Sequence, residues 1–455
     1  MEKEIENLKQ TVISLTNDLN DSKNQIIFLK QENNSLHQKI SNLEKIILDL
    51  KNNSEKNINN ILIKSFNQII NTLSLNNNSS NNENNTNKNK ELENPNKNML
   101  LFQNKNTYIQ KIISIFNNRK QNDTNIKITL DKINLIKTID EHNKNYIYSI
   151  IQLNDNRLGS CGEEYEYINL YNSETFELEE KIKLPCKFSY YLYPLDLNFL
   201  SICLDNGDIN IYELNFITFK YEFKCSLKGH SEGVNKIIET KNKKTLISIS
   251  NDKTIKFWNL NEKNEYILDN NFIQDENKIG NIIFINDEET EVVVCYNYFK
   301  NNKICFYNII KKEKIKTIEG IKVTNFSNQN LLKIDKYLFI GGQNKKGEII
   351  IINLDKKEIE KIFIDNNKEL GYFYCFLELN SSNEKVKRII CGDWNGNLVE
   401  YKINFIKNEN DEIKIDLEFV SIKSKVHKEL IRSIIKYNND KIVTCSIDGI
   451  IKIFK

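Results

Sequence analysis

The sequence predicts an all-β domain of seven similar units closed into a ring, preceded by a long α-helical parallel coiled coil. Residues 5–50 place apolar side chains at a regular 3-4 spacing. From about residue 130 onward, short apolar strands and polar turns recur at intervals of 41 to 53 residues. Three histidines fall at the same place within these C-terminal units. These observations divide the chain into a helical N-terminal part and a repetitive β-domain.

Length and charge exclude several classes of function. At 455 residues the chain has room for about three average domains, or for one large repeat domain with extensions. Its net charge of +2 gives no general attraction to nucleic acids or membranes. Lysine greatly outnumbers arginine, whereas a nucleic-acid reader usually needs more guanidinium groups. We therefore expect no nucleic-acid partner and no membrane partner. The arginines are Arg119, Arg157, Arg388 and Arg432.

The nine cysteines lie between Cys161 and Cys445, and none forms a C-x-x-C pair. Their odd number and apolar surroundings indicate reduced, buried thiols of an intracellular protein. No Cys/His cluster has the spacing of zinc ligands, so we expect no metal and no cofactor. The charged N-terminus is not a signal peptide, and no apolar run approaches the roughly 18 residues of a membrane span. We expect a cytoplasmic protein, with a nuclear or cytoskeletal location left open.

Residues 1–55 are predicted to form a parallel dimeric coiled coil. A hydrophobic period of 3.5 residues implies a left-handed coil rather than a lone surface helix. Mostly β-branched residues at the first core position and Leu at the second favour two parallel strands, and one Asn fixes their register. A long monomeric helix or a heteromeric coil is the alternative. The first positions are Ile5, Val12, Leu19, Ile26, Asn33, Ile40 and Ile47, and the second are Leu8, Leu15, Ser22, Leu29, Leu36, Leu43 and Leu50.

Further segments connect this coil to the β-domain. Residues 56–75 are predicted to form a short amphipathic helix. The Asn-rich residues 76–100 are predicted to be a disordered linker, because they contain almost nothing to bury. The β-domain extends over residues 101–455, with a short helix expected at 107–118 that could cap it. The apolar stripe of that helix is Tyr108, Ile112, Ile115 and Phe116.

The β-domain aligns on one anchor position at the end of a short strand. The best-preserved example is Trp258, which follows the strand Thr254-Ile-Lys-Phe. Every other anchor also follows a short strand, with another strand and a polar turn before it. This alignment gives seven units at a spacing close to that of known repeat architectures. The anchors are Tyr171, Tyr212, Trp258, Tyr307, Ile352, Tyr401 and Phe454.

The three histidines of this domain support the alignment. His142, His230 and His427 precede the anchors of the first, third and seventh units by 29, 28 and 27 residues. Chance placement of this kind is improbable. Asp252 comes 22 residues after His230, and a second aspartate, Asp448, comes 21 residues after the last histidine. In the first unit, Glu-Glu-Tyr stands where the aspartate would be.

The stretch from Lys228 to Leu260 resembles one WD repeat, and the rest of the domain is similar, more loosely, to the WD-repeat β-propeller family. The resemblance implies a seven-bladed β-propeller. It also implies that each turn histidine bonds the aspartate of the following tight turn, and that a Ser or Thr continues the network to the Trp. In the seventh unit Thr444 or Ser446 is available, but Phe454 has no N–H to donate. The residues of the third unit are His230, Asp252, Trp258 and Ser248 or Ser250.

A His–Asp pair can also act as a catalytic acid–base dyad. Repetition at equal spacing, however, is what a scaffold needs and what a single active site does not. We therefore interpret these residues as a structural network that satisfies buried polar groups between adjacent turns. The glycine-rich stretch Gly341–Gly347 lies between two predicted strands and lacks the helix that a phosphate-binding loop needs, so we interpret it as a hairpin turn.

The last unit lacks an outer strand of its own. A spare strand, Ile133–Ile139, precedes the first histidine, and the chain ends on the strand Ile450–Lys455. We expect the spare strand to pair with the terminal strand, because this pairing closes the ring and removes a sheet edge.

Four aromatic residues are candidates for partner binding. They lie in turns expected on the face of the propeller that carries the histidines. Exposed aromatic side chains beside polar rims are frequent interaction hot spots. The alternative is that they pack against their own loops. The four are Tyr165, Tyr298, Phe299 and Trp394.

The sequence therefore predicts a non-catalytic scaffold for protein–protein interactions. Two propellers on one coiled-coil homodimer would bind an unknown protein or peptide partner bivalently, which raises avidity without new contacts. The alternatives are a substrate-recognition subunit of a ubiquitin ligase and a regulatory subunit of a signalling, autophagy or cytoskeletal complex. An enzyme on this scaffold would need a cluster of carboxylates or histidines in the central channel, and the sequence shows none.

Overall fold

The fold was described from a computed structural model of the chain. The predicted coiled coil, the helix at 56–75, the linker and the helix at 107–118 lie outside the described residues, as does Asn33, and they stay predictions. The structure describes residues 128–455 except 143, 196–198, 216–217, 264, 297–302, 324–328, 380–385 and 408–412.

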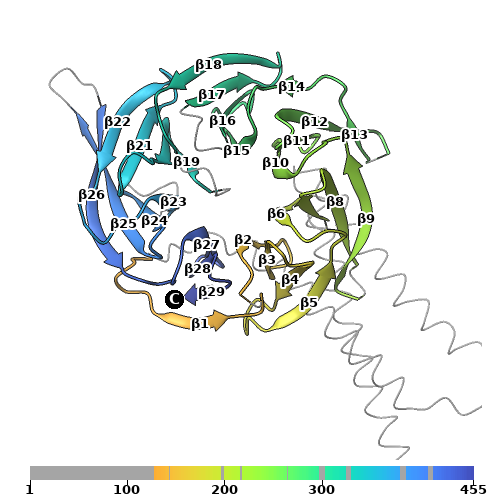
Figure 1. The fold of residues 1–455 in the computed structure, drawn as a ribbon, viewed down its shortest axis with the longest axis horizontal. Helices are drawn as coiled ribbons and strands as arrows, with labels where there is room; N and C mark the ends of the chain where they lie inside the picture. Colours follow the sequence, from red (N-terminus) through yellow and green to blue (C-terminus); the bar gives the residue numbers. More distant parts are fainter. Residues whose placement is uncertain are drawn as a thin grey trace, which may run out of the picture. The chain divides into compact units, whose positions relative to one another are not determined.

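The strands of the described residues form seven antiparallel sheets around a common centre (Figure 1). Six sheets follow one another along the chain, and the seventh joins the two ends of the β-domain. In five of the sheets, consecutive strands are neighbours throughout, whereas β14 pairs with β12 in the third sheet and β1 pairs with β29 in the seventh. The inner strands β2, β6, β10, β15, β19, β23 and β27 lie nearest the centre (Figure 1). The prediction of an all-β seven-bladed β-propeller is confirmed.

The blades are numbered along the chain. Blade 1 contains β2 (Ile147–Gln152), β3 (Leu158–Gly162), β4 (Tyr167–Tyr171) and β5 (Leu178–Lys183). Blade 2 contains β6 (Ser189–Pro194), β7 (Phe199–Leu204), β8 (Asp208–Asn215) and β9 (Lys220–Lys228). Blade 3 contains β10 (Val234–Glu239), β11 (Thr245–Ser250), β12 (Thr254–Leu260), β13 (Tyr266–Leu268) and β14 (Ile273–Gln274).

The remaining blades complete the ring. Blade 4 contains β15 (Ile279–Phe284), β16 (Glu291–Tyr296), β17 (Lys303–Asn308) and β18 (Glu313–Glu319). Blade 5 contains β19 (Leu331–Ile334), β20 (Tyr337–Gly341), β21 (Glu348–Asn353) and β22 (Glu358–Ile364). Blade 6 contains β23 (Phe373–Glu378), β24 (Lys387–Asp393), β25 (Leu398–Lys407) and β26 (Ile413–Lys423). Blade 7 contains β27 (Ile431–Tyr437), β28 (Lys441–Ser446), β29 (Ile451–Phe454) and β1 (Leu135–Ile139).

The predicted anchors occupy one equivalent position in all seven blades. Each lies on the third strand, is buried, and faces a buried aliphatic residue of the second strand. The sequence alignment therefore identified the equivalent position correctly in every blade. The pairs are Tyr171–Leu158, Tyr212–Leu200, Trp258–Leu246, Tyr307–Val292, Ile352–Leu338, Tyr401–Ile389 and Phe454–Ile442.

The core lies between the blades, which explains why their middle strands are apolar on both faces. β16 reads Glu-Val-Val-Val-Cys-Tyr and β21 reads Glu-Ile-Ile-Ile-Ile-Asn, and nearly all of these side chains are buried. One hydrophobic cluster joins Ile247 of blade 3 to Val294 of blade 4. A strand covered on both sides reads as a continuous apolar run rather than an alternating one. The outer strand β5, by contrast, carries charged residues at most positions and exposes several of them.

A chain of polar contacts also links the inner strands. The Lys236 ammonium group of β10 donates to Asn281 Oδ1 of β15 at 2.8 Å, and the Asn281 amide donates to Asn330 Oδ1 at 2.5 Å. The neighbouring Gln329 accepts hydrogen bonds from backbone N–H groups of β23 and β27. Polar groups thereby connect blade 3 to blade 7 around the inner side of the ring.

The expected closure of the ring is present. β1 pairs antiparallel with β29, from Leu135 opposite Phe454 to Ile139 opposite Ile451. Backbone hydrogen bonds between Asn134 and Lys455 extend this pairing. The first and last strands of the β-domain thus share one blade, and their pairing closes the ring.

The segment before β1 is fixed to blade 6 by a buried ion pair. Arg388 Nη1 lies 2.7 Å from Glu400 Oε1, and the other carboxylate oxygen accepts the Leu130 backbone N–H at 2.8 Å. The same guanidinium donates to the Ile128 carbonyl oxygen at 3.3 Å. Since the far end of β1 leads directly into the turn of His142, residues 128–134 lie on the opposite face of the ring. The chain therefore enters the propeller on the face away from the histidine turns.

Candidate recognition site

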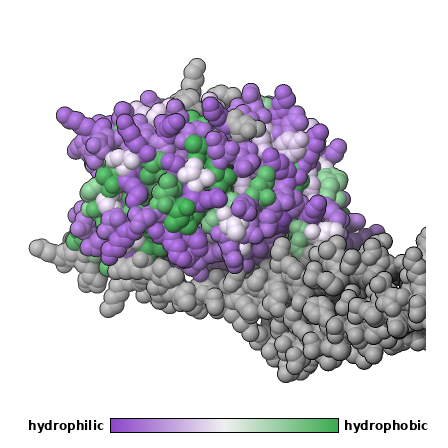
Figure 2. All heavy atoms as spheres, turned by 90° about the horizontal axis from the view of Figure 1, so that it is seen from below, coloured by the Kyte–Doolittle hydropathy of each residue, from purple (hydrophilic) through white to green (hydrophobic). Residues whose placement is uncertain are grey.

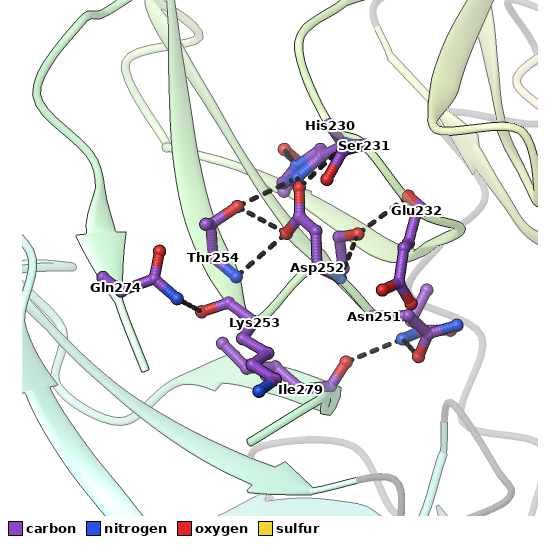
Figure 3. Close-up of polar contacts among 12 residues, drawn as sticks. His230, Ser231, Glu232, Asn251, Asp252, Lys253, Thr254, Gln274 and Ile279 are labelled. Atoms are coloured by element: carbon purple, nitrogen blue, oxygen red, sulfur yellow. Dashed lines mark hydrogen bonds and ion pairs between the residues drawn. The ribbon is translucent and has the colours of Figure 1, made fainter. Parts of the chain in front are cut away.

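The best-preserved turn network lies in blade 3. His230, in the turn between β9 and β10, places Nδ1 2.8 Å from Asp252 Oδ2 (Figure 3). Its Nε2 lies 2.7 Å from Ser248 Oγ. Trp258 Nε1–H donates to the same Ser248 oxygen at 2.8 Å. Because an ionised carboxylate only accepts, His230 Nδ1 carries the proton and Nε2 accepts from the serine hydroxyl. The hydrogen bonds therefore run in one direction, from the tryptophan through serine and histidine to the aspartate.

The carboxylate of this network is held ionised. Burial would raise the pKa of Asp252, but hydrogen bonds from His230, Thr254 and the Ser231 backbone outweigh burial and keep that pKa well below its usual range (Figure 3). Burial lowers the pKa of His230 despite the neighbouring carboxylate. Near neutral pH the pair is thus a neutral imidazole with an ionised aspartate. Ser250 bonds the Glu232 carbonyl oxygen and the Asp252 N–H, so it supports the turn instead of joining the tryptophan to the histidine.

The other two histidines have partial versions of the network. In blade 7, His427 bonds Thr444 Oγ1 at 2.8 Å and Asp448 at 3.1 Å, and the phenylalanine anchor donates nothing. In blade 1, His142 bonds Ser160 Oγ at 2.7 Å. Its Nδ1 has no hydrogen-bond partner among the described residues. The ring of Tyr165 lies 4.6 Å from the imidazole in place of the carboxylate.

Two aspartates form equivalent contacts that the sequence analysis missed. Asp275 lies in the turn before blade 4, and its Oδ2 accepts from Tyr296 at 2.9 Å and also from the anchor Tyr307. Asp365 lies in the turn before blade 6, and its Oδ2 accepts from the anchor Tyr401 at 2.8 Å. The signal was an aspartate directly after an outer strand combined with a tyrosine anchor. We interpret all five turns as structural, because each one satisfies buried polar groups locally.

A second repeated feature shapes the inner end of the ring on this face. The first strand of six blades pairs with a register shift after its first residue, which makes the second residue the extra member of a β-bulge. Bulges re-aim side chains and often occur beside functional sites. We call these extra residues the bulge residues. They are Tyr148, Tyr190, Asn235, Gly280, Tyr374 and Arg432.

Bulge residues of four successive blades lie around one guanidinium group, with which Tyr148 and Tyr374 both interact electrostatically. The Arg432 guanidinium lies 4.3 Å from the centroid of the Tyr148 ring, and the Tyr148 and Tyr190 rings are 5.8 Å apart. On the other side, the Tyr374 ring lies 5.7 Å from that of Trp394, which belongs to the turn between β24 and β25. We define the aromatic arc as these five residues, which extend from blade 6 through blade 7 to blade 2.

Trp394 is the exposed end of the arc. Its side chain is 46% exposed, whereas Arg432 is 8% exposed and Tyr374 is buried. The turn that carries it is rigid, because Asp393 accepts backbone N–H groups of Gly371 and Asn397 at 2.7 Å. Such a fixed, half-exposed indole against a buried tyrosine ring has the character of a recognition hot spot.

The other aromatic candidates differ from Trp394. Tyr165 is only 6% exposed, so the expectation that it contributes to an exposed face is wrong. Its hydroxyl lies within hydrogen-bond distance of two acceptors, the Glu141 carbonyl oxygen at 3.1 Å and Asn169 Oδ1 at 3.2 Å. Its ring fills the place of the missing aspartate beside His142. Tyr298 and Phe299 lie outside the described residues.

Other functional features were sought in the described part of the chain. No group of three or more His, Cys, Asp or Glu side chains there could hold a metal ion. The nine cysteines, all within it, are free thiols. A membrane-spanning helix of sufficient length and apolarity was not found among these residues.

A closed ring of seven antiparallel blades, with polar networks at its turns, defines a repeat-built β-propeller. Residues 221–259 match the family model described as "WD domain, G-beta repeat". The matched segment runs from β9 into β12 and includes His230, Asp252 and Trp258. This match and the seven-bladed fold together support the WD-repeat family.

Two curated relatives share partial similarity with the chain. Protein Ycf2 of Marchantia polymorpha is 26% identical over 335 residues, which cover 64% of this chain and 14% of that protein. The RecBCD enzyme subunit RecB of Buchnera aphidicola subsp. Acyrthosiphon pisum is 25% identical over 223 residues, which cover 45% of this chain and 18% of that protein. The chain spans less than a fifth of either relative, so neither similarity supports an argument about activity or partners.

Proposed function

We propose that the protein is a non-catalytic interaction scaffold whose aromatic arc docks a segment of a protein partner. The observation that carries the proposal is Trp394, exposed, rigidly mounted and in ring contact with Tyr374 beside the buried Arg432. Tyr, Trp and Arg are the residues that dominate binding energy at interfaces, because they bring large contact areas at low entropic cost. WD-repeat propellers are typically non-catalytic, which agrees with this proposal.

The direction in which the chain enters the ring supports the same function. Residues 128–134 are bound to blade 6 on the face away from the histidine turns. The attachment of this segment therefore leaves the aromatic arc, which lies on the opposite face, uncovered. Two linked arcs would bind a partner with two copies of the target segment with raised avidity.

Replacement of Trp394 by alanine tests the proposal. Partners would be identified by proximity labelling with the full chain, and their affinities measured with the purified protein. Trp394→Ala should weaken the affinity for the principal partner by at least about tenfold, as expected for a hot-spot residue. Phe272→Ala, which removes a ring that is 45% exposed on the outer side of blade 3, is the matched control and should have no effect. Equal affinities for both variants would refute the proposed docking site.

A further inference from the structure

The turns around Trp394 differ in charge from the other turns of the same face. Seen from the side, hydrophilic residues dominate the upper edge of the ring, and hydrophobic residues gather in the middle of its outer side (Figure 2). Turns form the edges of a propeller, so the charge that a partner meets at such a face depends mainly on the turns. Trp394 lies in the turn between β24 and β25, and hydrogen bonds join this turn to four others.

The turn between β22 and β23 is in direct contact with that of Trp394. The Trp394 backbone N–H donates to the Tyr372 carbonyl oxygen at 2.9 Å. A Cβ atom added at Gly371 would lie 2.9 Å from the Trp394 Cβ, so the two turns pack closely. The Gly371 carbonyl oxygen accepts the Gly347 N–H at 2.9 Å, which joins the turn between β20 and β21 to the other two.

Two further turns extend this group. The Ser424 hydroxyl, in the turn between β26 and β27, donates to Glu369 Oε2 of the middle turn at 2.9 Å. The Gln343 backbone N–H donates to the Lys322 carbonyl oxygen at 2.9 Å, which adds the turn after β18. Hydrogen bonds thus join five turns around blades 5 to 7 into one continuous surface, which we call the Trp394 surface. It consists of residues 320–323, 342–347, 365–372, 394–397 and 424–430.

The Trp394 surface has a large excess of positive charge. Six of its lysines are exposed, whereas its exposed carboxylates are those of Glu369 and Glu429. The ammonium groups of these lysines form no ion pair with any residue in the part of the chain that the structure describes. They are therefore available to the carboxylates of a partner. The lysines are Lys322, Lys345, Lys346, Lys368, Lys425 and Lys428.

The turns of blades 1 to 3 on the same face lack this excess. Their exposed carboxylates outnumber their exposed lysines by four to three. Positive charge is thus concentrated on the side of the ring that carries Trp394. The carboxylates are Asp140, Glu141, Glu164 and Glu232, and the lysines are Lys144, Lys187 and Lys253.

We propose that the segment docked on the aromatic arc is an acidic peptide, with an apolar side chain against Trp394 and carboxylates beside the lysines of the Trp394 surface. This inference rests on the proposed function, because it names the chemistry of the segment that the same site takes. Complementary charge on two surfaces speeds their encounter and disfavours partners of the wrong sign. The half-exposed indole supplies the apolar contact, and the exposed lysines around it select the charge.

A peptide fits this surface better than a single-stranded nucleic acid does. A nucleic-acid strand needs a positively charged groove that follows its backbone. The aromatic arc continues from Trp394 to Tyr148 and Tyr190, where the turns of blades 1 and 2 carry no excess of positive charge. Glu369 and Glu429 also interrupt the lysines of the Trp394 surface. A peptide can place its carboxylates beside the lysines and uncharged residues over the rest of the arc.

Selection of peptides on the full chain tests the acidic character of the segment. A random peptide library displayed on phage would be selected on the immobilised wild-type protein, with Trp394→Ala for counter-selection. Peptides that depend on Trp394 should carry more Asp and Glu than Lys and Arg. Combined Lys345→Glu and Lys346→Glu should weaken their affinity by at least about tenfold, because like charges then face each other. Combined Lys187→Glu and Lys253→Glu changes two exposed lysines elsewhere on this face and should leave the affinity nearly unchanged.

Failure of this inference differs from failure of the proposed function. Trp394-dependent peptides without an acidic excess, or equal effects of the two lysine pairs, would overturn the inference and leave the docking site in place. The absence of any Trp394-dependent peptide would refute the docking site itself. Binding of an oligothymidylate that competes with the selected peptides would assign the surface to nucleic acid and overturn the inference. Since all four substituted lysines are exposed, circular dichroism should show unchanged folding of both variants.

Discussion

At equivalent turns of the ring, different combinations of side chains occupy the same buried positions. Blade 3 uses histidine and serine, blades 4 and 6 use an aspartate and a tyrosine anchor, and blade 1 places the Tyr165 ring against a histidine. The histidines could be predicted because their spacing to the anchor is nearly constant. Asp275 and Asp365 could not, because they lie 32 and 36 residues before their tyrosines and replace the expected residue type.

Removal of the Ser248 hydroxyl should cost more stability than removal of its counterpart in blade 7. Ser248→Ala leaves the Trp258 N–H and the His230 Nε2 without partners in a buried site. Thr444→Val leaves only the His427 Nε2 without a partner, since Phe454 donates nothing. Each unsatisfied buried group costs about 1–3 kcal/mol, so the first variant should lose roughly twice as much. Urea unfolding of both variants provides the comparison, and equal losses would contradict the directed network.

Acid should weaken the ring through His142. Burial, and secondarily the charge of Lys181, lower the pKa of His142 from 6.5 to about 3. Below pH 6.5 the unfolded chain therefore binds a proton at this histidine that the folded chain does not bind. The contribution of His142 leaves stability unaffected above pH 6.5 and lowers it as the pH drops toward 3. At pH 5 the loss from this residue is about 2 kcal/mol.

The change in stability between two pH values is the measurement that isolates this effect. The free energy of unfolding would be determined in urea at pH 7 and pH 5 for the wild-type protein and for His142→Gln. The variant should lose about 2 kcal/mol less between the two pH values, whatever its stability at pH 7. An identical loss in both proteins would mean that His142 is protonated in the folded state.

Strand assignments at the scale of elements followed from the sequence, but the contacts that join distant elements did not. The spare strand before the first histidine was predicted to close the ring, because blade 7 lacked an outer strand, and β1 occupies that place. The contact between Leu130 and Glu400 joins residues 270 positions apart and leaves no periodic signal. The inner-strand bulges were also missed, because one extra residue changes the alternation of a strand without changing its composition.

Neutralisation of Glu400 should release the segment before β1. Glu400→Gln leaves the Arg388 charge buried without its partner, which costs about 3–5 kcal/mol, and weakens the acceptor of the Leu130 N–H. Hydrogen exchange should accelerate over residues 128–139 before it does in blades 2 to 4. Glu418→Gln changes a carboxylate of the same blade that pairs with Lys402 on the surface, and should leave exchange unchanged. Uniform acceleration across all blades would show that the ion pair stabilises the ring as a whole.

For the molecule as a whole, the sequence alignment placed the anchors of all seven blades correctly, whereas the structure of the N-terminal part of the chain stays a prediction. The anchors could be found because a repeated blade needs a large apolar residue at one fixed place between its neighbours. The proposed docking surface could not be found in the same way, since it combines side chains from blades 6, 7, 1 and 2 that share no sequence motif. Arg432 gave the one available signal, as a rare arginine in a lysine-rich chain.

The predicted coiled coil should make the full chain a dimer. Sedimentation equilibrium should give twice the mass of one chain, and removal of residues 1–55 should give a monomer with an intact propeller. Removal of these residues should also weaken binding to an immobilised, divalent partner by orders of magnitude while leaving the affinity for a monovalent peptide unchanged. A full chain that sediments as a monomer at tens of micromolar would exclude the bivalent arrangement.

The inner-strand bulges have a consequence for how such a protein can change over time. Each bulge residue stands outside the register of paired residues, so its replacement leaves every neighbouring pair of the blade in place. Tyrosine, asparagine, glycine and arginine already occupy these positions in different blades of one ring. Mutation can therefore change the chemistry of the proposed docking surface one blade at a time without a change in strand register.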